Sequence, residues 1–383
     1  MLPPNSSISN SEAPASPRPF SARKLGRTAV YFLLFLALFE IATWAIFTKT
    51  RLAGSSLKRF FWYGTSYEAK LREMVYTPDL PKNSVLYAGW LGDGKLATLP
   101  ADVDLTVYGM SFSGNLSAAI HELRPELKQR NVGGPGAPLN HTYAIYQVDK
   151  KLRKTRFGII GVTSTAVQEV LLMNRGSLYA DAAFPYFFPR FKVGPDGGVV
   201  RVADSLINSA AELRAAFDDP ELWRRQLAVL AENDDAYHRF YFARDPLDAS
   251  ALGRFARRGV SKHHLKDYTG QILGPAGFNR DHEATQVFRA LLRQMVRELR
   301  AENVQPIVAL FSLQGHGNHL YSLVEDILRE DSIPYINSYD YCRSDERDNF
   351  QPDLHFVHSC DLAFARRAGE LIDAAAPKGP PRP

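Results

Sequence analysis

Three residues of this chain have the types and spacing of a serine nucleophile with its base and orienting acid. Ser111 lies in the run YGMSFS, and Asp353 and His355 lie together in QPDLHF. A serine hydroxyl needs a base to take its proton, and that base needs a carboxylate to orient it. Asp353 and His355 are close enough in sequence to share one loop, with His358 as an alternative base. The pattern predicts acyl-transfer chemistry at Ser111.

The same residues also have ordinary structural interpretations. Ser111 precedes an expected helix, and serine is a common N-cap. Residues 353–355 also fit an Asp turn beside a partly buried histidine. A metal-dependent hydrolase is a further alternative, with ligands drawn from His316, His319, His263, His264 and residues 281–283. The chain contains no HExxH or CxxC spacing, so we expect no metal site and no cofactor. We expect His316 to line the substrate cleft instead.

The elements around these residues alternate between short apolar runs and amphipathic segments. The expected strands are 104–110, 157–162, 306–313 and 334–337, and the expected helices are 111–127, 138–153, 282–302, 318–330 and 361–375. Strands that alternate with helices of this length predict an α/β fold, a short, mostly parallel sheet in a three-layer sandwich. Ligands of such sheets bind beyond the carboxyl ends of the strands, which is where Ser111 is expected.

The chain divides into segments of different composition. We expect a disordered tail at 1–28, a transmembrane anchor at 29–47, a juxtamembrane helix and linker at 48–82, an α/β domain at 83–376 with a helical insertion at about 172–281, and a disordered tail at 377–383. The insertion is interpreted either as a cap that shapes a substrate cleft or as a helical subdomain with its own small core.

The apolar run AVYFLLFLALFEIATWAIF at 29–47 is the expected membrane anchor. At about 1.5 Å per residue a helix of this length spans roughly 28 Å, which matches the hydrocarbon thickness of a bilayer. A cleaved signal peptide and a buried core helix are the alternatives. Glu40 is costly inside such a span unless it lies near an interface or faces a partner helix. We expect the folded domain on the extracytoplasmic side.

Composition limits the remaining choices. The net charge of +5 over 383 residues is too weak and dispersed to predict nucleic-acid binding. The two cysteines, Cys342 and Cys360, would form one disulfide in an oxidising compartment or remain two buried thiols. Hydrophobic residues make up 45% of the chain, as in an ordinary globular protein.

Taken together, the motifs resemble those of the SGNH, or GDSL-like, hydrolase and acyltransferase superfamily. GMSFS at 109–113 is similar to the GDSFS block of that family, and DLH at 353–355 is similar to its terminal Asp–His block. NVGGPGAP at 131–138 resembles the second block, which implies that Gly136 provides an oxyanion-hole N–H. Met110 stands where the family usually has Asp, and the third block lacks its usual Asn. Thr163 or Ser164 is expected to donate a hydrogen bond in its place.

The resemblance implies a membrane-anchored serine esterase or O-acyltransferase that acts on acyl esters, chiefly acetyl esters, of cell-surface polysaccharide. Its expected partners are an acylated carbohydrate or small ester and the membrane, without nucleic acid; the sequence does not say which proteins, if any, it binds. A catalytically inactive carbohydrate-binding or scaffold protein of the same fold is the alternative, because Met110 and the missing Asn depart from the family pattern.

Overall fold

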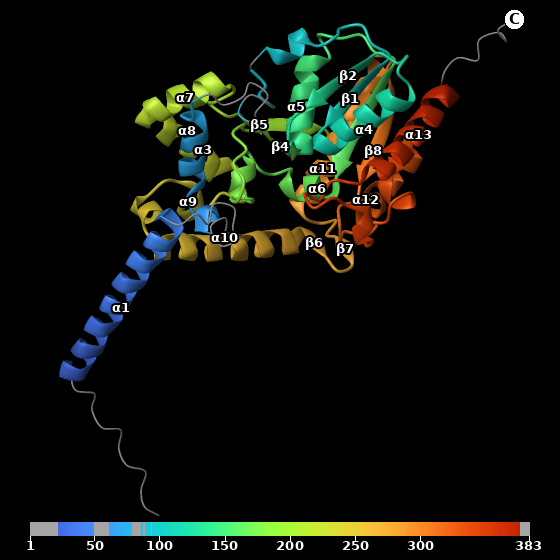
Figure 1. Ribbon diagram of the computed structural model, residues 1–383. Coiled ribbons are helices and arrows are strands. Elements are labelled where there is room, and N and C mark those ends of the chain that lie inside the picture. Colours follow the sequence, from blue (N-terminus) through green and yellow to red (C-terminus); the bar gives the residue numbers. More distant parts are fainter. Residues whose placement is uncertain (1–21, 50–60, 79–85, 87–88, 93, 376–383) are drawn as a thin grey trace, which may run out of the picture.

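A five-stranded parallel sheet forms the centre of the molecule (Figure 1). The computed structural model describes residues 22–49, 61–78, 86, 89–92 and 94–375. The strands are β1 (Leu105–Gly109), β2 (Gln129–Gly133), β3 (Phe157–Thr163), β8 (Gln305–Phe311) and β9 (Tyr335–Asn337). Their order is β2-β1-β3-β8-β9, and every neighbouring pair is parallel. Chain direction across the sheet reverses at β1 and β3, so ligands are expected beyond the carboxyl ends of these two strands.

Helices cover both faces of the sheet because its inner strands are buried on both sides. Helices α4 (Ser111–Leu123) and α13 (His358–Ala375) pack on the face that includes Ile159. Helices α5 (Leu139–Asp149), α11 (Glu283–Ala301) and α12 (His319–Glu330) pack on the face that includes Ile160. The α/β fold with a parallel sheet is therefore confirmed.

Most expected elements agree with the structure to within a few residues. The helix expected over 111–127 ends at Leu123, two residues before Pro125, whose preceding residue is disfavoured in helical conformation. The last helix begins at His358, three residues earlier than expected. The edge strand β2 and the short helix α6 (Ser164–Glu169), which follows β3 directly, were not among the expected elements.

The insertion contains hairpins as well as helices. Its elements are η3 (Arg175–Ser177), β4 (Arg190–Val193), β5 (Val199–Ala203), α7 (Ala210–Asp218), α8 (Pro220–Asn233), α9 (Arg239–Phe242), η4 (Pro246–Ala249), α10 (Ala251–Ile272), β6 (Leu273–Gly274) and β7 (Gly277–Phe278). Phe188 and Trp223 of this segment belong to the same buried cluster as Tyr108 and Val162 of the sheet. The insertion therefore shares the main core, and the interpretation as a subdomain with its own core is wrong.

The segment expected to be a juxtamembrane helix and linker also joins this core. Helix α3 (Tyr67–Val75) buries Tyr67 and Leu71 completely. The Tyr67 hydroxyl donates a hydrogen bond to Phe184 O at 2.6 Å, in the insertion. Residues 67–75 are therefore part of the folded body. Short helices η2 (Lys95–Thr98), η5 (Ser338–Asp340) and η6 (Arg347–Asn349) complete the described elements.

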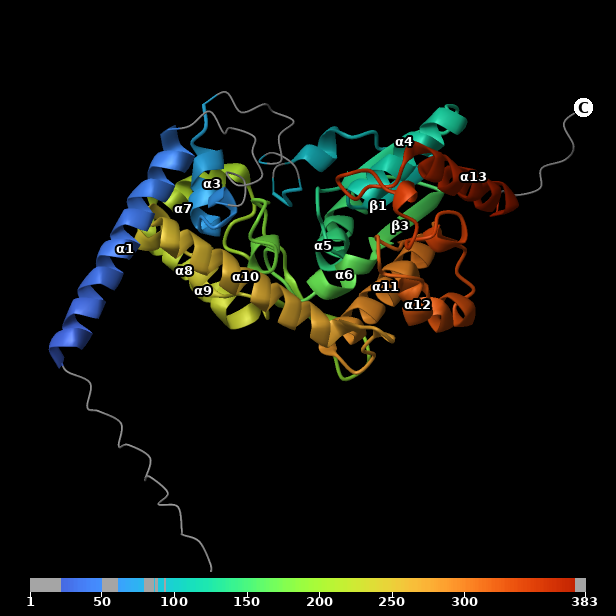
Figure 2. The same cartoon turned by 60° about the horizontal axis from the view of Figure 1, so that its bottom comes forward.

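The amino-terminal helix α1 (Ala22–Lys49) extends away from the α/β body and meets it near one end (Figures 1 and 2). Residues Ala22–Ile46 are long and apolar enough to cross a membrane, and a signal sequence has the same properties. The helix begins at Ala22, not at residue 29, because the charged residues before the apolar run are good helix formers. Disordered tails were expected at 1–28 and 377–383. Residues 22–28 belong to α1, so the expectation is wrong there, and the remainder of both tails lies outside the described residues.

Glu40 connects α1 to the body of the protein. Its carboxylate accepts hydrogen bonds from Leu252 N at 3.1 Å, from Ser250 Oγ at 3.2 Å and from Ala251 N. These groups form the start of α10, whose first N–H groups have no intrahelical acceptor. A carboxylate at the positive end of a helix is stabilised by the helix dipole. The acidic residue of the apolar run therefore faces a partner helix, one of the two positions expected for it.

A disulfide joins Cys342, after η5, to Cys360, in the first turn of α13. The sequence left this bond and two free thiols as alternatives, and the structure contains the bond. The loop that it closes carries both Asp353 and His355.

Candidate active site

Ser111 stands at a sharp turn between β1 and α4. Gly109 ends the strand with φ +140°, and a Cβ there would lie 2.2 Å from Ser113 Oγ, so the turn requires glycine. Met110 is the N-cap of α4, and Ser111 is the first residue of the helix. The Ser111 Oγ lies 2.7 Å from His355 Nε2. The serine therefore contacts the histidine and does not cap its helix.

Asp353 and His355 occupy one tight loop before α13. His355 Nδ1 lies 3.1 Å from Asp353 Oδ2, and the His355 N–H donates to Asp353 Oδ1 at 3.2 Å. This backbone hydrogen bond, with the imidazole contact, holds the pKa of Asp353 below its usual value. The loop closes through Gln351 N, which donates to His355 O at 2.7 Å, and Leu354 adopts φ +70°. The loop geometry directs one imidazole nitrogen to the carboxylate and the other to Ser111.

Aromatic packing fixes the plane of the imidazole. The His355 ring stacks on Phe112 with centroids 4.7 Å apart. Phe112 in turn packs edge-on against Phe356, which is fully buried beside Phe311 and Phe364. Phe112 was not selected from the sequence, although it directly follows the serine. Its ring holds the His355 imidazole against the helix that carries Ser111.

Backbone N–H groups suited to an oxyanion lie after the carboxyl ends of β1 and β2. The N–H groups of Ser111 and Phe112 begin α4 and have no intrahelical acceptor. Gly136 lies on the loop after β2 with φ +63°, and its N–H donates to no other group in the described part of the chain. The next residue, Ala137, belongs to the same buried cluster as Met110 and Phe112. Gly133 at the end of β2 pairs with Gly109 at the end of β1, so the Gly136 loop follows the strand next to the one that precedes Ser111.

Thr163 and Ser164, the expected replacements for the missing amide, are both fully buried at the end of β3. Thr163 Oγ1 lies 3.6 Å from Met110 Sδ and 3.1 Å from Thr165 Oγ1. Ser164 Oγ accepts a hydrogen bond from Leu313 N at 3.1 Å. Both hydroxyls thus contact neighbouring protein groups at the base of the site.

Other histidines contact groups outside the set of Ser111, Asp353 and His355. His316 follows β8, and its pKa is lowered by burial and by neighbouring His319. His358 Nε2 pairs with Glu122 at 3.2 Å, on the surface. His263 pairs with Asp267 at 3.1 Å. Within the described ranges, no three His, Cys, Asp or Glu side chains form a group with metal-site geometry.

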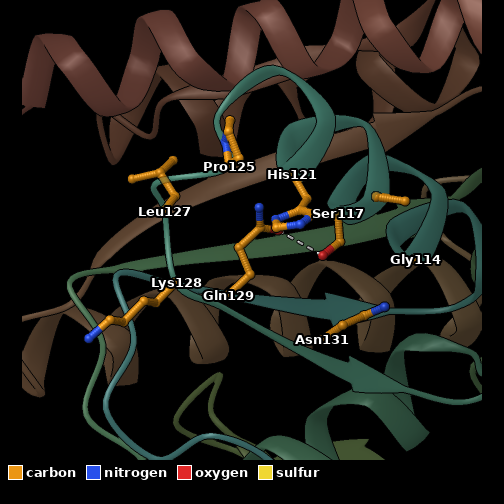
Figure 3. Close-up of a pocket in the computed structure, with 9 residues that line it drawn as sticks. Gly114, Ser117, His121, Pro125, Leu127, Lys128, Gln129 and Asn131 are labelled. Atoms are coloured by element: carbon orange, nitrogen blue, oxygen red, sulfur yellow. Dashed lines mark hydrogen bonds between the residues drawn. The ribbon is translucent and has the colours of Figure 1, made fainter.

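The triad lies at an open surface. The Asp353 side chain is 66% exposed and the His355 side chain 25% exposed. A separate cavity of about 510 Å³ lies between α4 and the edge strand β2, with His121, Gln129 and Asn131 among its lining residues (Figure 3). The triad residues do not line it. Ser111, Asp353 and His355 therefore meet at the surface, outside this cavity.

Comparisons with protein-family models, with curated proteins and with solved structures found no match for this chain. Its function is therefore inferred from the site itself. A serine hydrogen-bonded to an imidazole, which contacts a carboxylate, beside free N–H groups, can perform nucleophilic acyl transfer.

Proposed function

We propose that this chain is a membrane-anchored serine esterase or O-acyltransferase. One observation carries the proposal: Ser111 Oγ lies 2.7 Å from His355 Nε2, while His355 Nδ1 lies 3.1 Å from Asp353 Oδ2. Residues more than two hundred positions apart meet in the order nucleophile, base and orienting acid. A serine that merely caps its helix would not require a histidine and a carboxylate in this arrangement.

In the first half-reaction His355 Nε2 takes the proton of Ser111 as Oγ bonds to the carbonyl carbon of an ester. The carbonyl electron pair moves onto oxygen, where N–H groups of Ser111, Phe112 and Gly136 stabilise it. The intermediate collapses, and His355 returns the proton to the departing alcohol. Asp353 holds the imidazole in place and stabilises its charged form.

In the second half-reaction an acceptor hydroxyl gives its proton to His355 and attacks the acyl group on Ser111. Collapse of this intermediate returns the proton to Ser111 Oγ. Water as acceptor gives hydrolysis, and a sugar hydroxyl gives acyl transfer. Both outcomes use the same residues.

We further propose that the domain is a divergent member of the SGNH superfamily, with its three-layer sandwich. The sheet order β2-β1-β3-β8-β9 and helices on both faces support this assignment. So do the positions of Ser111 after the first strand and His355 before the last helix.

We place the folded domain outside the cytoplasm, anchored by α1. Glu40 supports a retained anchor over a cleaved signal, because removal of α1 would leave the first N–H groups of α10 without this acceptor. The disulfide between Cys342 and Cys360 supports an oxidising compartment. Arg23, Lys24 and Arg27 before the apolar run favour a cytoplasmic amino terminus.

The substrate class we propose is an acyl ester, chiefly an acetyl ester, on cell-surface polysaccharide. The exposed Asp353 and His355 support a substrate that approaches an open surface, as a polymer does, over one enclosed in a deep pocket. An inactive carbohydrate-binding protein is the second candidate. Thr163 and Ser164 are buried, so neither hydroxyl is an obvious substitute for the Asn that the third block lacks. A missing oxyanion donor favours this second candidate.

Labelling with a fluorophosphonate probe tests the proposal. Full-length protein in mild detergent is compared with Ser111→Ala, His355→Ala and the control Ser117→Ala, which changes a serine further along the same helix. We expect labelling of wild type and Ser117→Ala, none of Ser111→Ala, and a loss of about 100-fold or more for His355→Ala. Unlabelled but folded wild type would reject catalysis and favour the binding protein.

A further inference from the structure

A buried ion pair, whose two groups lie beyond hydrogen-bond distance of each other, is found beside the Gly136 loop. The Glu169 side chain is fully buried, and neither carboxylate oxygen accepts a hydrogen bond of standard geometry from the described residues. The nearest cation is Arg175, whose Nη2 lies 3.7 Å from Glu169 Oε1, beyond hydrogen-bond distance. The Arg175 Nε is also buried without an acceptor. The Arg175 side chain is only 22% exposed, and the N–H groups of such a guanidinium normally donate hydrogen bonds to protein acceptors. The donors of Arg175 that lack an acceptor therefore need an explanation.

The guanidinium is directed at the proposed oxyanion loop. A Cβ placed on Gly136 would lie 1.9 Å from Arg175 Nη1, so the group occupies the space that any other residue at position 136 would fill. The rings of Phe184 and Tyr179 lie 4.7 Å and 5.1 Å from the guanidinium carbon. Two aromatic rings therefore flank the guanidinium, and its Nη1 lies against Gly136.

The backbone of Arg175 is firmly held. Asn174 Oδ1 accepts from Gly176 N at 2.7 Å. The buried carboxylate of Asp234, on the insertion, accepts from Asn174 N at 3.1 Å and from Ser177 Oγ at 2.8 Å. A donor that is fixed before the reaction costs no reorganisation when charge develops. The insertion thus supports this turn at the carboxyl edge of the sheet.

We propose that Arg175 is an oxyanion donor of the acyl-transfer reaction and takes the place of the amide that this chain lacks. The inference rests on the proposed function. When Ser111 Oγ bonds to the ester carbon, the carbonyl electron pair moves to oxygen, and the Arg175 and Gly136 N–H groups bind that oxygen together. On collapse the pair returns to the carbonyl bond. Buried Glu169 keeps the guanidinium charge compensated between turnovers.

The test compares Arg175→Gln, Arg175→Lys and Arg175→Ala with wild type, all as full-length protein in detergent. The control is Arg293→Gln, which removes an arginine of similar exposure, 29%, from a surface pair. The readouts are the rate of fluorophosphonate labelling and kcat and KM for p-nitrophenyl acetate, a neutral ester.

We expect Arg175→Gln to lower kcat by roughly 100- to 1,000-fold with KM changed by less than about threefold. Lysine keeps the charge without the planar fork, so Arg175→Lys should lose about tenfold. Millimolar guanidinium should restore part of the activity of Arg175→Ala. The control should match wild type.

Three results would overturn the inference. Wild-type rates for Arg175→Gln in labelled, folded enzyme would remove Arg175 from the reaction while leaving Ser111 in place. A defect confined to KM, or to esters that carry a carboxylate, would make Arg175 a substrate-anion binder. Absence of labelling in wild type would reject the proposed function itself. If Arg175→Gln does not fold, kcat of Arg175→Lys relative to wild type replaces it: a loss of about tenfold supports the inference, and an unchanged kcat overturns it.

Discussion

Breaking the bond between Cys342 and Cys360 should loosen the loop that holds the base. The two cysteines are 18 residues apart, and the loop between them contains Asp353 and His355. Closing a loop of this length removes chain entropy from the unfolded state worth about 3 kcal/mol at 25 °C. Both cysteines are buried, so the bond links the segment after the last strand to the first turn of α13 within the protein interior.

The experiment measures urea unfolding of the full-length protein in detergent by tryptophan fluorescence. Oxidised wild type, the same protein reduced with dithiothreitol, and the double variant Cys342→Ala/Cys360→Ala are compared. Reduced wild type differs from the oxidised form by the bond and not by side-chain volume, so it separates the cross-link from the cavities that alanine leaves. We expect the free energy of unfolding to fall by about 3 kcal/mol on reduction, and by somewhat more in the variant.

The rate of fluorophosphonate labelling should fall as well, by about tenfold, because His355 would sample positions away from Ser111. A fall in stability with an unchanged labelling rate would show that the aromatic contacts of His355 suffice to hold the loop. A change of less than about 1 kcal/mol on reduction would refute the reasoning about the cross-link.

Four further outcomes are expected. Burial lowers the pKa of His141 to about 4, so the stabilising contribution of this neutral histidine is present above pH 6.5 and is lost as the pH falls towards 4. The free energy of unfolding in urea should fall by about 3 kcal/mol over this range, and His141→Gln should flatten the pH dependence. Asp353→Asn should slow labelling by about 10- to 100-fold, less than the roughly 10⁴-fold loss seen for a buried triad acid, because this carboxylate is exposed. Glu40→Gln should lower stability by about 1 kcal/mol through the weakened start of α10, measured by thermal unfolding in detergent. Gly136→Ala should slow labelling by about tenfold or more, because its Cβ would collide with Arg175 Nη1 and the residue requires φ +63°.

Each of these outcomes has a clear opposite. The same slope of stability against pH in His141→Gln would assign the titration to another group. An Asp353→Asn loss near 10⁴-fold would mean that the carboxylate is shielded from water during the reaction. Unchanged melting of Glu40→Gln would show that α1 is not held by its carboxylate. Wild-type labelling of Gly136→Ala would contradict the proposed position of the oxyanion.

The sequence by itself determined four of the five strands and the identity of the proposed nucleophile and base; the edge strand β2 alternates buried and exposed residues and was not recognised. Buried strands must be continuous apolar runs, and amphipathic helices repeat every 3.6 residues, so 104–110 and 282–302 were recognisable without neighbours. Because parallel strands place their carboxyl ends at one edge, the position of Ser111 followed from its place after β1. A loop of three residues was enough to pair Asp353 with His355.

Only the tertiary structure decided which distant groups meet. Arg175 lies in no motif, and the turn that carries it beside Gly136 donates hydrogen bonds to the carboxylate of Asp234, far along the insertion. The pairing of Glu40 with α10 and the bond between the two cysteines are likewise long-range contacts, which no local pattern encodes. Local periodicity reports how a segment buries its own side chains, whereas the donors around a reacting atom come from separate segments that only the packed fold brings together.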